Sequence, residues 1–154
     1  MSDELRPGEV IADLPPAADA AIRFVGRIRT PFKTRADCPR QGHPDGPICR
    51  IVVDSPWDAA LDGIEAYEVI EVVYWLHQAR RDLVRQSPKS DGQTRGTFSL
   101  RSPVRPNPIG LSRVRLAART GNVLEVRGLD CLDGTPLIDL KPDRCVYAVQ
   151  APPK

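Results

Sequence analysis

The chain has 154 residues and a formal net charge of +2, and 18 of its 22 basic residues are arginines. This length suits one domain with a sizeable core. No run approaches the roughly 18 apolar residues of a membrane span, and no basic segment followed by an apolar one marks a secretory signal. The sequence therefore predicts one cytoplasmic domain that does not enter a membrane.

Charge is distributed unevenly along the chain. Residues 1–19 are rich in proline and alanine and carry five carboxylates against Arg6, which leaves a net charge of +6 on the rest. Such a segment has no sustained periodicity and predicts a mobile tail. The arginine-rich remainder suits a polyanionic partner, because the guanidinium fork matches phosphate and carboxylate groups. A basic surface without any partner is the alternative.

The first half of the chain predicts mainly strands. Residues 21–30 alternate as a strand does, and residues 30–47 form an irregular, proline-containing loop. A short strand follows at 48–54, and residues 55–64 predict one or two helical turns. The Val, Ile, Tyr and Trp residues of 66–79 favour a long strand, buried on both faces, over a helix.

The second half continues this pattern. Residues 80–93 predict a polar connector and residues 94–100 another strand. Residues 112–130 predict a hairpin around Thr120-Gly121-Asn122, and we place Arg119 in this solvent-facing turn. Two further strands, 136–142 and 145–150, close the chain.

About seven or eight strands with little helix predict an all-β fold. A single antiparallel sheet curled into a small barrel would hide its own edges. We therefore expect a mobile tail over residues 1–19, followed by a β-barrel domain with short helical turns over residues 20–150.

The segment "RSPVRPNPIGLS" (101–112) is unusually rich in proline. Proline fixes φ and lacks a backbone donor, so these positions exclude a helix and a central strand. The segment predicts a stiff loop that displays Arg101, Arg105 and Asn107. Displayed polar side chains on such loops are typical of binding and catalytic sites.

The remaining chemical signals are mostly negative. The sequence has no nucleotide-binding glycine motif, no P-loop and no G-x-S-x-G. Its four cysteines form no C-x-x-C pair, and neither His43 nor His77 belongs to a metal-ligand pair. Free thiols and no metal are the main expectation, with a disulfide or metal site as the alternative.

Three polar clusters carry a family resemblance: "CPRQG" (38–42), "RSPVRPNPIGLS" and "GLDCLDGTPLIDLKP" (128–142). In this order, and together with "FVGRIRTPFKTRAD" and "LHQARRD", they resemble the TsaA-like (TrmO) family. The resemblance implies a small β-barrel that binds S-adenosyl-L-methionine as a homodimer, with the cofactor near the interface. It also implies a tRNA methyltransferase that acts on the exocyclic amine of threonylcarbamoyl-adenosine beside the anticodon.

The resemblance also implies particular site residues. The cofactor contacts would be Pro39, Arg40, Gln41, His77, Gln78, Arg101, Leu111, Asp130, Cys131, Leu132, Asp133 and Gly134. Two features differ from the family pattern. Asp143 follows Lys141-Pro142 where an aromatic residue is common, and longer relatives carry a further C-terminal domain.

Each assignment has a structural alternative. Arg40 or Arg101 can pair with the cofactor carboxylate, and Asp130 or Asp133 with its amino group or ribose. The Asp133-Gly134 stretch can instead be a simple turn, and His77-Gln78 ordinary residues at a strand end.

Asn107 is the candidate catalytic residue, because a polar group that accepts the amine N–H bonds can orient the attacking lone pair. By analogy, Asn-Pro loops serve other amino-methyltransferases on unrelated folds. In the alternative, Asn107 only satisfies backbone groups of its own loop.

Three functions remain open from the sequence. The first is a methyltransferase acting on tRNA, the second a methyltransferase acting on another RNA or a small molecule, and the third a non-catalytic S-adenosyl-L-methionine sensor. For an RNA substrate, Arg80, Arg81 and Arg85 can form a phosphate-binding edge or a solvated connector.

Overall fold

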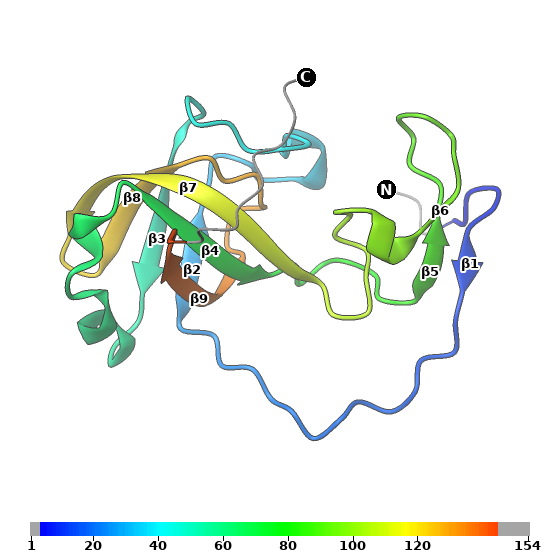
Figure 1. The fold of residues 1–154 in the computed structure, drawn as a ribbon, viewed down its shortest axis with the longest axis horizontal. Helices are drawn as coiled ribbons and strands as arrows, with labels where there is room; N and C mark the ends of the chain where they lie inside the picture. Colours follow the sequence, from blue (N-terminus) through cyan, green and yellow to red (C-terminus); the bar gives the residue numbers. More distant parts are fainter. Residues whose placement is uncertain (1–3, 145–154) are drawn as a thin grey trace.

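The computed structural model describes residues 4–144, which form a closed β-barrel and a small separate sheet (Figure 1). The barrel strands are β2 (Gly26–Arg29), β3 (Ile48–Val53), β4 (Val69–Trp75), β7 (Ile109–Thr120), β8 (Val123–Arg127) and β9 (Pro136–Pro142). They pair antiparallel in the order β2-β3-β8-β7-β4-β9, and closure removes every barrel edge. The predicted all-β, antiparallel barrel is confirmed.

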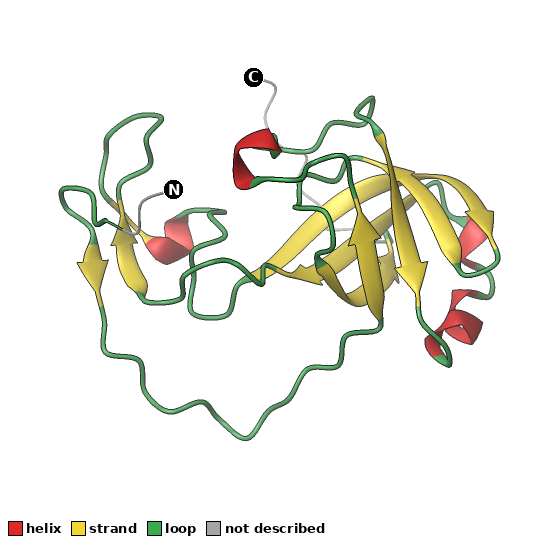
Figure 2. Ribbon diagram, turned by 180° about the vertical axis from the view of Figure 1, so that it is seen from behind, coloured by secondary structure: helices red, strands yellow, loops and turns green. Residues whose placement is uncertain are grey.

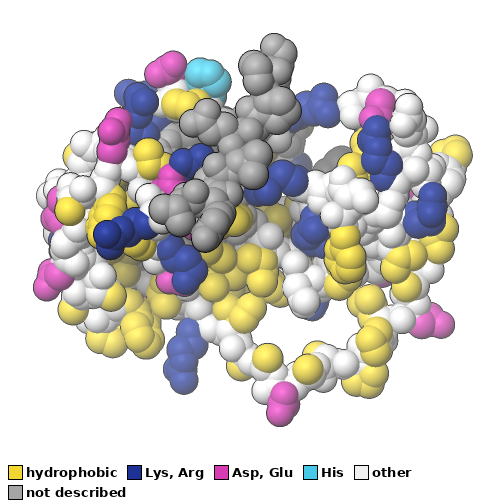
Figure 3. All heavy atoms as spheres, in the orientation of Figure 1, with side chains coloured by type: hydrophobic (Ala, Val, Ile, Leu, Met, Phe, Trp, Pro, Cys, Tyr) yellow, Lys and Arg dark blue, Asp and Glu magenta, His cyan; other side chains and the backbone are white. Residues whose placement is uncertain are grey.

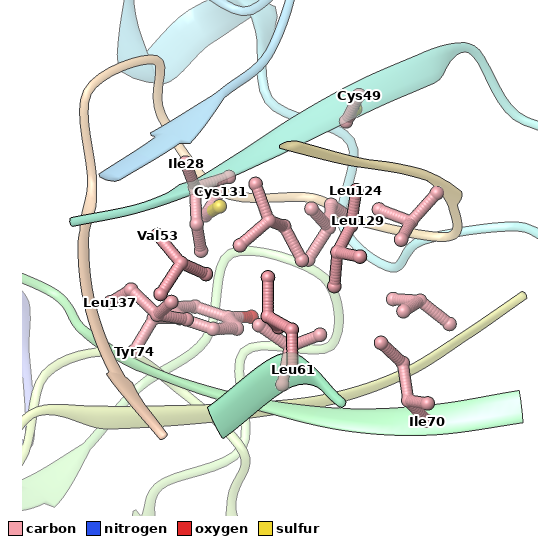
Figure 4. Close-up of a cluster of buried hydrophobic side chains, with 14 residues drawn as sticks. Ile28, Cys49, Val53, Leu61, Ile70, Tyr74, Leu124, Leu129, Cys131 and Leu137 are labelled. Carbon is pink, nitrogen blue, oxygen red and sulfur yellow. The ribbon is translucent and has the colours of Figure 1, made fainter. Parts of the chain in front are cut away.

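The barrel interior is filled by apolar side chains from alternate strand positions (Figure 4). In β4 the residues Ile70, Val72 and Tyr74 point inward, and those between them are partly exposed. The expectation that this strand is buried on both faces is therefore wrong. The core comprises Ile28, Cys49, Ile51, Val53, Leu61, Ile70, Val72, Tyr74, Val114, Leu124, Val126, Leu129, Cys131 and Leu137.

Short 3₁₀ turns lie between the strands (Figure 2), and the sequence predicted such turns only at residues 55–64. They are η1 (Arg35–Asp37), η2 (Trp57–Leu61), η3 (Ile64–Ala66) and η4 (Thr97–Ser99). Gly63, between η2 and η3, has φ +86°, a conformation that favours glycine. Arg119 does not lie in a solvent-facing turn, since it donates to Leu61 O at 3.1 Å and to Glu65 at 2.9 Å. Its role is to fasten η2 and η3 to the barrel.

The small sheet consists of β1 (Val10–Ile11), β5 (Leu83–Gln86) and β6 (Arg95–Gly96), in the order β1-β5-β6. Its buried interior is mostly polar. Thr97 Oγ1 donates to Leu83 O at 2.7 Å and accepts from Gln86 Nε2 at 2.9 Å. Only Leu83 among its buried side chains is apolar.

This small sheet is where the structure differs most from the sequence-based expectations. Residues 80–93, expected as a polar connector, contain β5, and the N-terminal segment expected as a tail contributes β1. The strand expected over 94–100 is limited to β6 and continues as η4. Strands this short carry almost no alternation, so pairing and hydrogen bonding decide their structure. The strand expected at 145–150 lies outside the described residues.

No helix within residues 4–144 is long and apolar enough to cross a membrane. The first barrel strand was expected from residue 21, yet regular pairing starts only at Gly26. Between β1 and β2 the chain forms an extended connection that loops away from both sheets (Figure 1).

Candidate functional site at the loop end of the barrel

Two of the predicted clusters meet at one end of the barrel, in the loop after β2 and the loop between β8 and β9. Gly42 and Gly128 are the point of closest approach, because a Cβ on Gly42 would lie 1.7 Å from Gly128 O. A side chain at Gly42 is therefore excluded. This contact places the neighbouring, exposed residues Pro39, Arg40 and Gln41 beside the β8–β9 loop.

Asp133 joins these two loops. Its carboxylate accepts from Lys33 Nζ at 2.7 Å and from the Thr30 amide at 3.1 Å, and Arg29 Nε lies 3.4 Å away. The hydrogen bond from Lys33 holds the pKa of Asp133 below its usual value, against the effect of burial. Gly134, with φ +82°, donates its amide to Ile28 O at 2.8 Å. The Asp-Gly pair is thus a turn, and its carboxylate is largely occupied.

Asp130 occupies a different environment in the same loop. Its Oδ1 accepts a hydrogen bond of 3.0 Å from the phenol of Tyr74, which is also 2.8 Å from Ser112 Oγ. Gly110 makes room for this ring, since a Cβ there would lie 2.2 Å from Tyr74 Cε2. Sequence reasoning missed Tyr74 and Ser112. The Gly-x-Ser spacing within "IGLS", opposite an aromatic residue, was the available signal.

Arg101 and Leu111 extend this part of the site. Arg101 Nη2 donates to Leu111 O at 3.0 Å, next to Ser112. Both side chains are exposed, and Arg101 has no carboxylate partner within residues 4–144. Arg101 therefore contacts the β7 backbone next to Ser112, while the Leu111 side chain points outward, away from the Tyr74–Asp130 contact.

Cys131 and Leu132 have structural roles in this loop. The Cys131 side chain belongs to the barrel core, and its carbonyl accepts from Thr30 Oγ1 at 2.9 Å. Burial raises the pKa of Cys131 to about 12. The Leu132 carbonyl accepts from Thr135 Oγ1 at 2.6 Å. The Cys131 side chain therefore cannot contact a ligand on the outside of the barrel.

Asn107 lies in a second group, around the end of β4. Its Oδ1 accepts from Arg81 Nη2 at 3.4 Å, while Arg81 Nε donates to Pro106 O at 2.6 Å. Arg81 also lies 5.4 Å from the ring centroid of Trp75, a cation–π arrangement. Asn107 is exposed, and its side chain contacts a neighbouring segment instead of the backbone of its own loop.

His77 and Gln78 follow β4 directly and are exposed. The preceding residue, Leu76, donates its amide to Pro108 O at 2.7 Å, so this strand end lies beside the proline loop. The proline loop is irregular, as predicted, but Arg105 turns back to donate to Leu100 O and Ser102 O. Of the three residues predicted to be displayed by this loop, Arg101 and Asn107 are exposed.

The three arginines of residues 80–85 do not form one continuous phosphate-binding edge. Arg80 pairs with Asp82 at 2.7 Å, and Arg81 is held against the proline loop. Arg85 is exposed on β5 and makes no ion pair within the described part of the chain. On the face shown in Figure 3, Lys and Arg side chains lie over both the barrel and the small sheet.

No group of three or more His, Cys, Asp or Glu side chains within residues 4–144 is arranged to hold a metal ion. Cys38, Cys49 and Cys131 are free thiols, and burial raises the pKa of each. Cys145 lies outside the described residues. At ordinary pH these three thiols stay protonated, which makes them poor nucleophiles.

The fold and site define a small closed antiparallel barrel whose polar loops gather at one end, with a second polar group beside β4. Residues 27–147 match the family model described as the tRNA-methyltransferase O N-terminal domain. The chain belongs to this family, and the resemblance identified from its motifs is confirmed.

Individual relatives support the same assignment. The chain is 54% identical over 151 residues to a "Probable S-adenosyl-L-methionine-binding protein VirR" of Rhizobium radiobacter, covering 98% of this chain and 86% of that protein. It is 35% identical over 130 residues to the "tRNA (adenine(37)-N6)-methyltransferase" of Escherichia coli K12, covering 77% of this chain and 55% of that protein.

A solved structure shares the fold. A crystal structure of TrmO from Pseudomonas aeruginosa superposes with a TM-score of 0.69 at 30% identity, over 88% of this chain and 61% of that one. The chain thus spans about three fifths of the TrmO chain that it matches.

Proposed function

We propose that this protein is an S-adenosyl-L-methionine-dependent methyltransferase that modifies tRNA at the exocyclic amine of threonylcarbamoyl-adenosine beside the anticodon. The supporting observation is the charge pattern of the loop end. Arg101 has no carboxylate partner within residues 4–144, and Asp130 has no cationic one. The amino-acid end of the cofactor carries both charges, so these residues fit a zwitterion.

Methyl transfer from a sulfonium is an in-line displacement, so the protein contributes mainly by positioning the two reactants. In this proposal the cofactor supplies the methyl group, and Asn107 accepts an N–H bond of the acceptor amine. An amide oxygen can accept two hydrogen bonds. The contact with Arg81 leaves one of these positions on Asn107 Oδ1 available.

We also propose a homodimer with the cofactor near its interface. Ile109 and Leu111 are 39% and 45% exposed on the outer face of β7, and their partners on β4 are Trp75 and Val73. Figure 3 shows hydrophobic side chains gathered near the centre of the visible face, over this part of the barrel. An apolar outer patch of this kind is typical of a protein–protein interface. Sedimentation should show a dimer.

Turnover with unmodified and threonylcarbamoyl-modified tRNA tests the function. We expect S-adenosylhomocysteine to be released only with the modified tRNA, and mass spectrometry should find the methyl group on its base. Release of S-adenosylhomocysteine with a different RNA or a small molecule would assign a different substrate. Several relatives are named only as S-adenosyl-L-methionine-binding proteins, which favours a non-catalytic sensor as the second candidate. A sensor would bind the cofactor without any release.

Two variants separate chemistry from binding. Asn107→Ala should lower turnover sharply at nearly unchanged cofactor affinity, because its hydrogen bond would matter mainly in the transition state. Arg101→Ala should weaken cofactor binding about ten- to a hundredfold, the range for a contact to a charged group. Arg115→Ala is the matched control, since Arg115 is exposed on β7, the strand whose Leu111 carbonyl Arg101 contacts, and lies 4.0 Å from Glu68. Full turnover by a folded Asn107→Ala protein would remove the catalytic role.

A further inference from the structure

The two aspartates of the β8–β9 loop differ in the partners that the fold gives them. Asp133 contacts Lys33, Arg29 and the Thr30 amide, and its side chain is only 14% exposed. Asp130 receives one hydrogen bond, on Oδ1, and has no ion pair within residues 4–144. The Asp133 carboxylate is paired inside the protein, whereas Oδ2 of Asp130 has no hydrogen-bond partner within residues 4–144 and is available to a ligand.

The contact to Asp130 has a fixed direction. The phenol of Tyr74 has a single proton, and an ionised carboxylate can only accept. Tyr74 therefore donates to Asp130 at 3.0 Å and accepts the 2.8 Å hydrogen bond from the Ser112 hydroxyl. Burial, followed by the charge of Asp130, raises the pKa of Tyr74 far above its usual value, so the phenol remains a donor.

The donor is also rigidly placed. The Tyr74 side chain is 4% exposed and comes from the inward-facing positions of β4. Its ring lies directly against Gly110, where no side chain would fit. Ser112, two residues further along β7, completes the arrangement. A buried, packed phenol holds its carboxylate partner in one orientation, as supporting residues do in preorganised sites.

We propose that Tyr74 and Ser112 are positioning residues that orient the Asp130 carboxylate toward the cationic part of S-adenosyl-L-methionine, whereas Asp133 only fastens the loop. This inference rests on the proposed function, because it assumes that the cofactor binds. It goes further in assigning separate roles to two carboxylates in one motif, and in adding two residues from β4 and β7 to the site.

The surrounding electrostatics favour a cationic ligand. After burial, the charge of Asp130 is a further cause of the raised pKa values of Cys38 and Cys131. Its negative potential thus extends to side chains on both loops. The cofactor offers two positive groups, an ammonium and a sulfonium, whereas S-adenosylhomocysteine keeps only the ammonium.

Calorimetry with both ligands tests the proposal. Asp130→Asn should weaken S-adenosyl-L-methionine binding about ten- to a hundredfold. An equal loss for S-adenosylhomocysteine would place the ammonium at Asp130, and a smaller loss would place the sulfonium there. Tyr74→Phe should weaken binding about three- to tenfold, as expected for one lost hydrogen bond.

The double variant separates positioning from a general structural effect. If Tyr74 acts through Asp130, adding Tyr74→Phe to Asp130→Asn should cause no further loss of affinity. Losses that multiply would overturn the positioning role. If Tyr74→Phe fails to fold, Ser112→Ala combined with Asp130→Asn provides the same cycle from the other end of the hydrogen-bond chain.

Two variants serve as matched controls. Tyr67→Phe removes a phenol that forms no hydrogen bond within residues 4–144, and Asp139→Asn removes a carboxylate that pairs with Lys141 at 3.0 Å. Both should bind like the wild type. A folded Asp130→Asn protein with wild-type affinity for both ligands would overturn the proposal. If the wild type itself binds neither ligand, the proposed function fails instead.

Discussion

The barrel and the small sheet are built from the same kind of strand but are stabilised differently. Inside the barrel, side chains such as Leu124 and Val126 are fully buried, and each stabilises the fold by about 1.5–3 kcal/mol. The buried side chains of the small sheet are mainly polar: Gln86, Ser87 and Thr97. Gln86 and Thr97 hydrogen-bond to each other, and Ser87 donates to the N-terminal segment. A typical hydrogen bond contributes only about 1 kcal/mol net. The small sheet should therefore open locally at a lower free energy than the barrel.

The largest effect should come from the barrel core. Leu124→Ala removes a side chain with no exposed surface and should lower the free energy of unfolding by about 2–5 kcal/mol. Denaturant unfolding measures this loss. Val84→Ala on the small sheet, where the side chain is 44% exposed, should change it by less than about 0.5 kcal/mol. If the two variants lose similar amounts of the free energy of unfolding, the barrel core is not the more stabilising of the two units.

A smaller, local effect should follow from Thr97→Val. The change keeps the shape of the side chain and leaves Leu83 O and one Gln86 proton without this partner, at a cost of about 1–3 kcal/mol. Hydrogen exchange should accelerate in β5 and remain unchanged in β4 and β7. Thr120→Val, at the exposed end of β7, is the control. Equal acceleration in the barrel would show that the two units open together.

The attachment of the N-terminal segment to the small sheet should depend on pH. Burial raises the pKa of Glu9, but hydrogen bonds from the amides of Arg6 and Ser87 and the charge of Arg6 outweigh this effect and hold it below its ordinary 4.5. A lowered pKa gives stability that is present above 4.5 and is lost as the pH falls below it. Exchange of the Ser87 amide should therefore accelerate in acid. Glu9→Gln should remove this dependence, and a persisting acid response would assign it to another carboxylate.

The smallest effect concerns RNA. Arg85 is exposed on the small sheet without an ion pair within residues 4–144, whereas Arg50 on the barrel lies 3.5 Å from Glu125. If Arg85 contacts a phosphate, Arg85→Ala should flatten the slope of log K against log salt by about 0.7–0.9. Arg50→Ala should leave the slope unchanged. The opposite result would place the RNA on the barrel.

The sequence predicted the barrel better than the small sheet for a physical reason. β7 and β8 are long enough to show alternation around a clear turn, so their hairpin is visible in the pattern. Strands of two residues, such as β1 and β6, show no pattern at all. They exist because distant segments hydrogen-bond to β5, which local preferences cannot reveal.

In the candidate site, too, the sequence could not reveal contacts between distant segments. The motifs indicated Asp130 and Asp133 equally, because both are acidic residues in one loop. Their partners distinguish them: Asp130 accepts from Tyr74, whereas Asp133 contacts Lys33, Arg29 and the Thr30 amide. All of these partners come from distant parts of the sequence. Asn107 was predicted to be displayed, and it is, but its contact with Arg81 depends on how two loops meet.

The extended connection between β1 and β2 makes the first strand a tethered peptide. Residues 13–23 form no hydrogen bond or ion pair within the described part of the chain. The segment before them is held by the short β1–β5 pairing, by the hydrogen bond from the Ala12 amide to Asp82 O, and by contacts of Pro7 and Glu9 with Ser87. A flexible tether of this length has an average span of about 20 Å, which holds its end at an effective concentration of about millimolar. So weak a pairing persists because it is intramolecular. Cutting the tether should release β1, and the free peptide added back at micromolar concentration should not rebind.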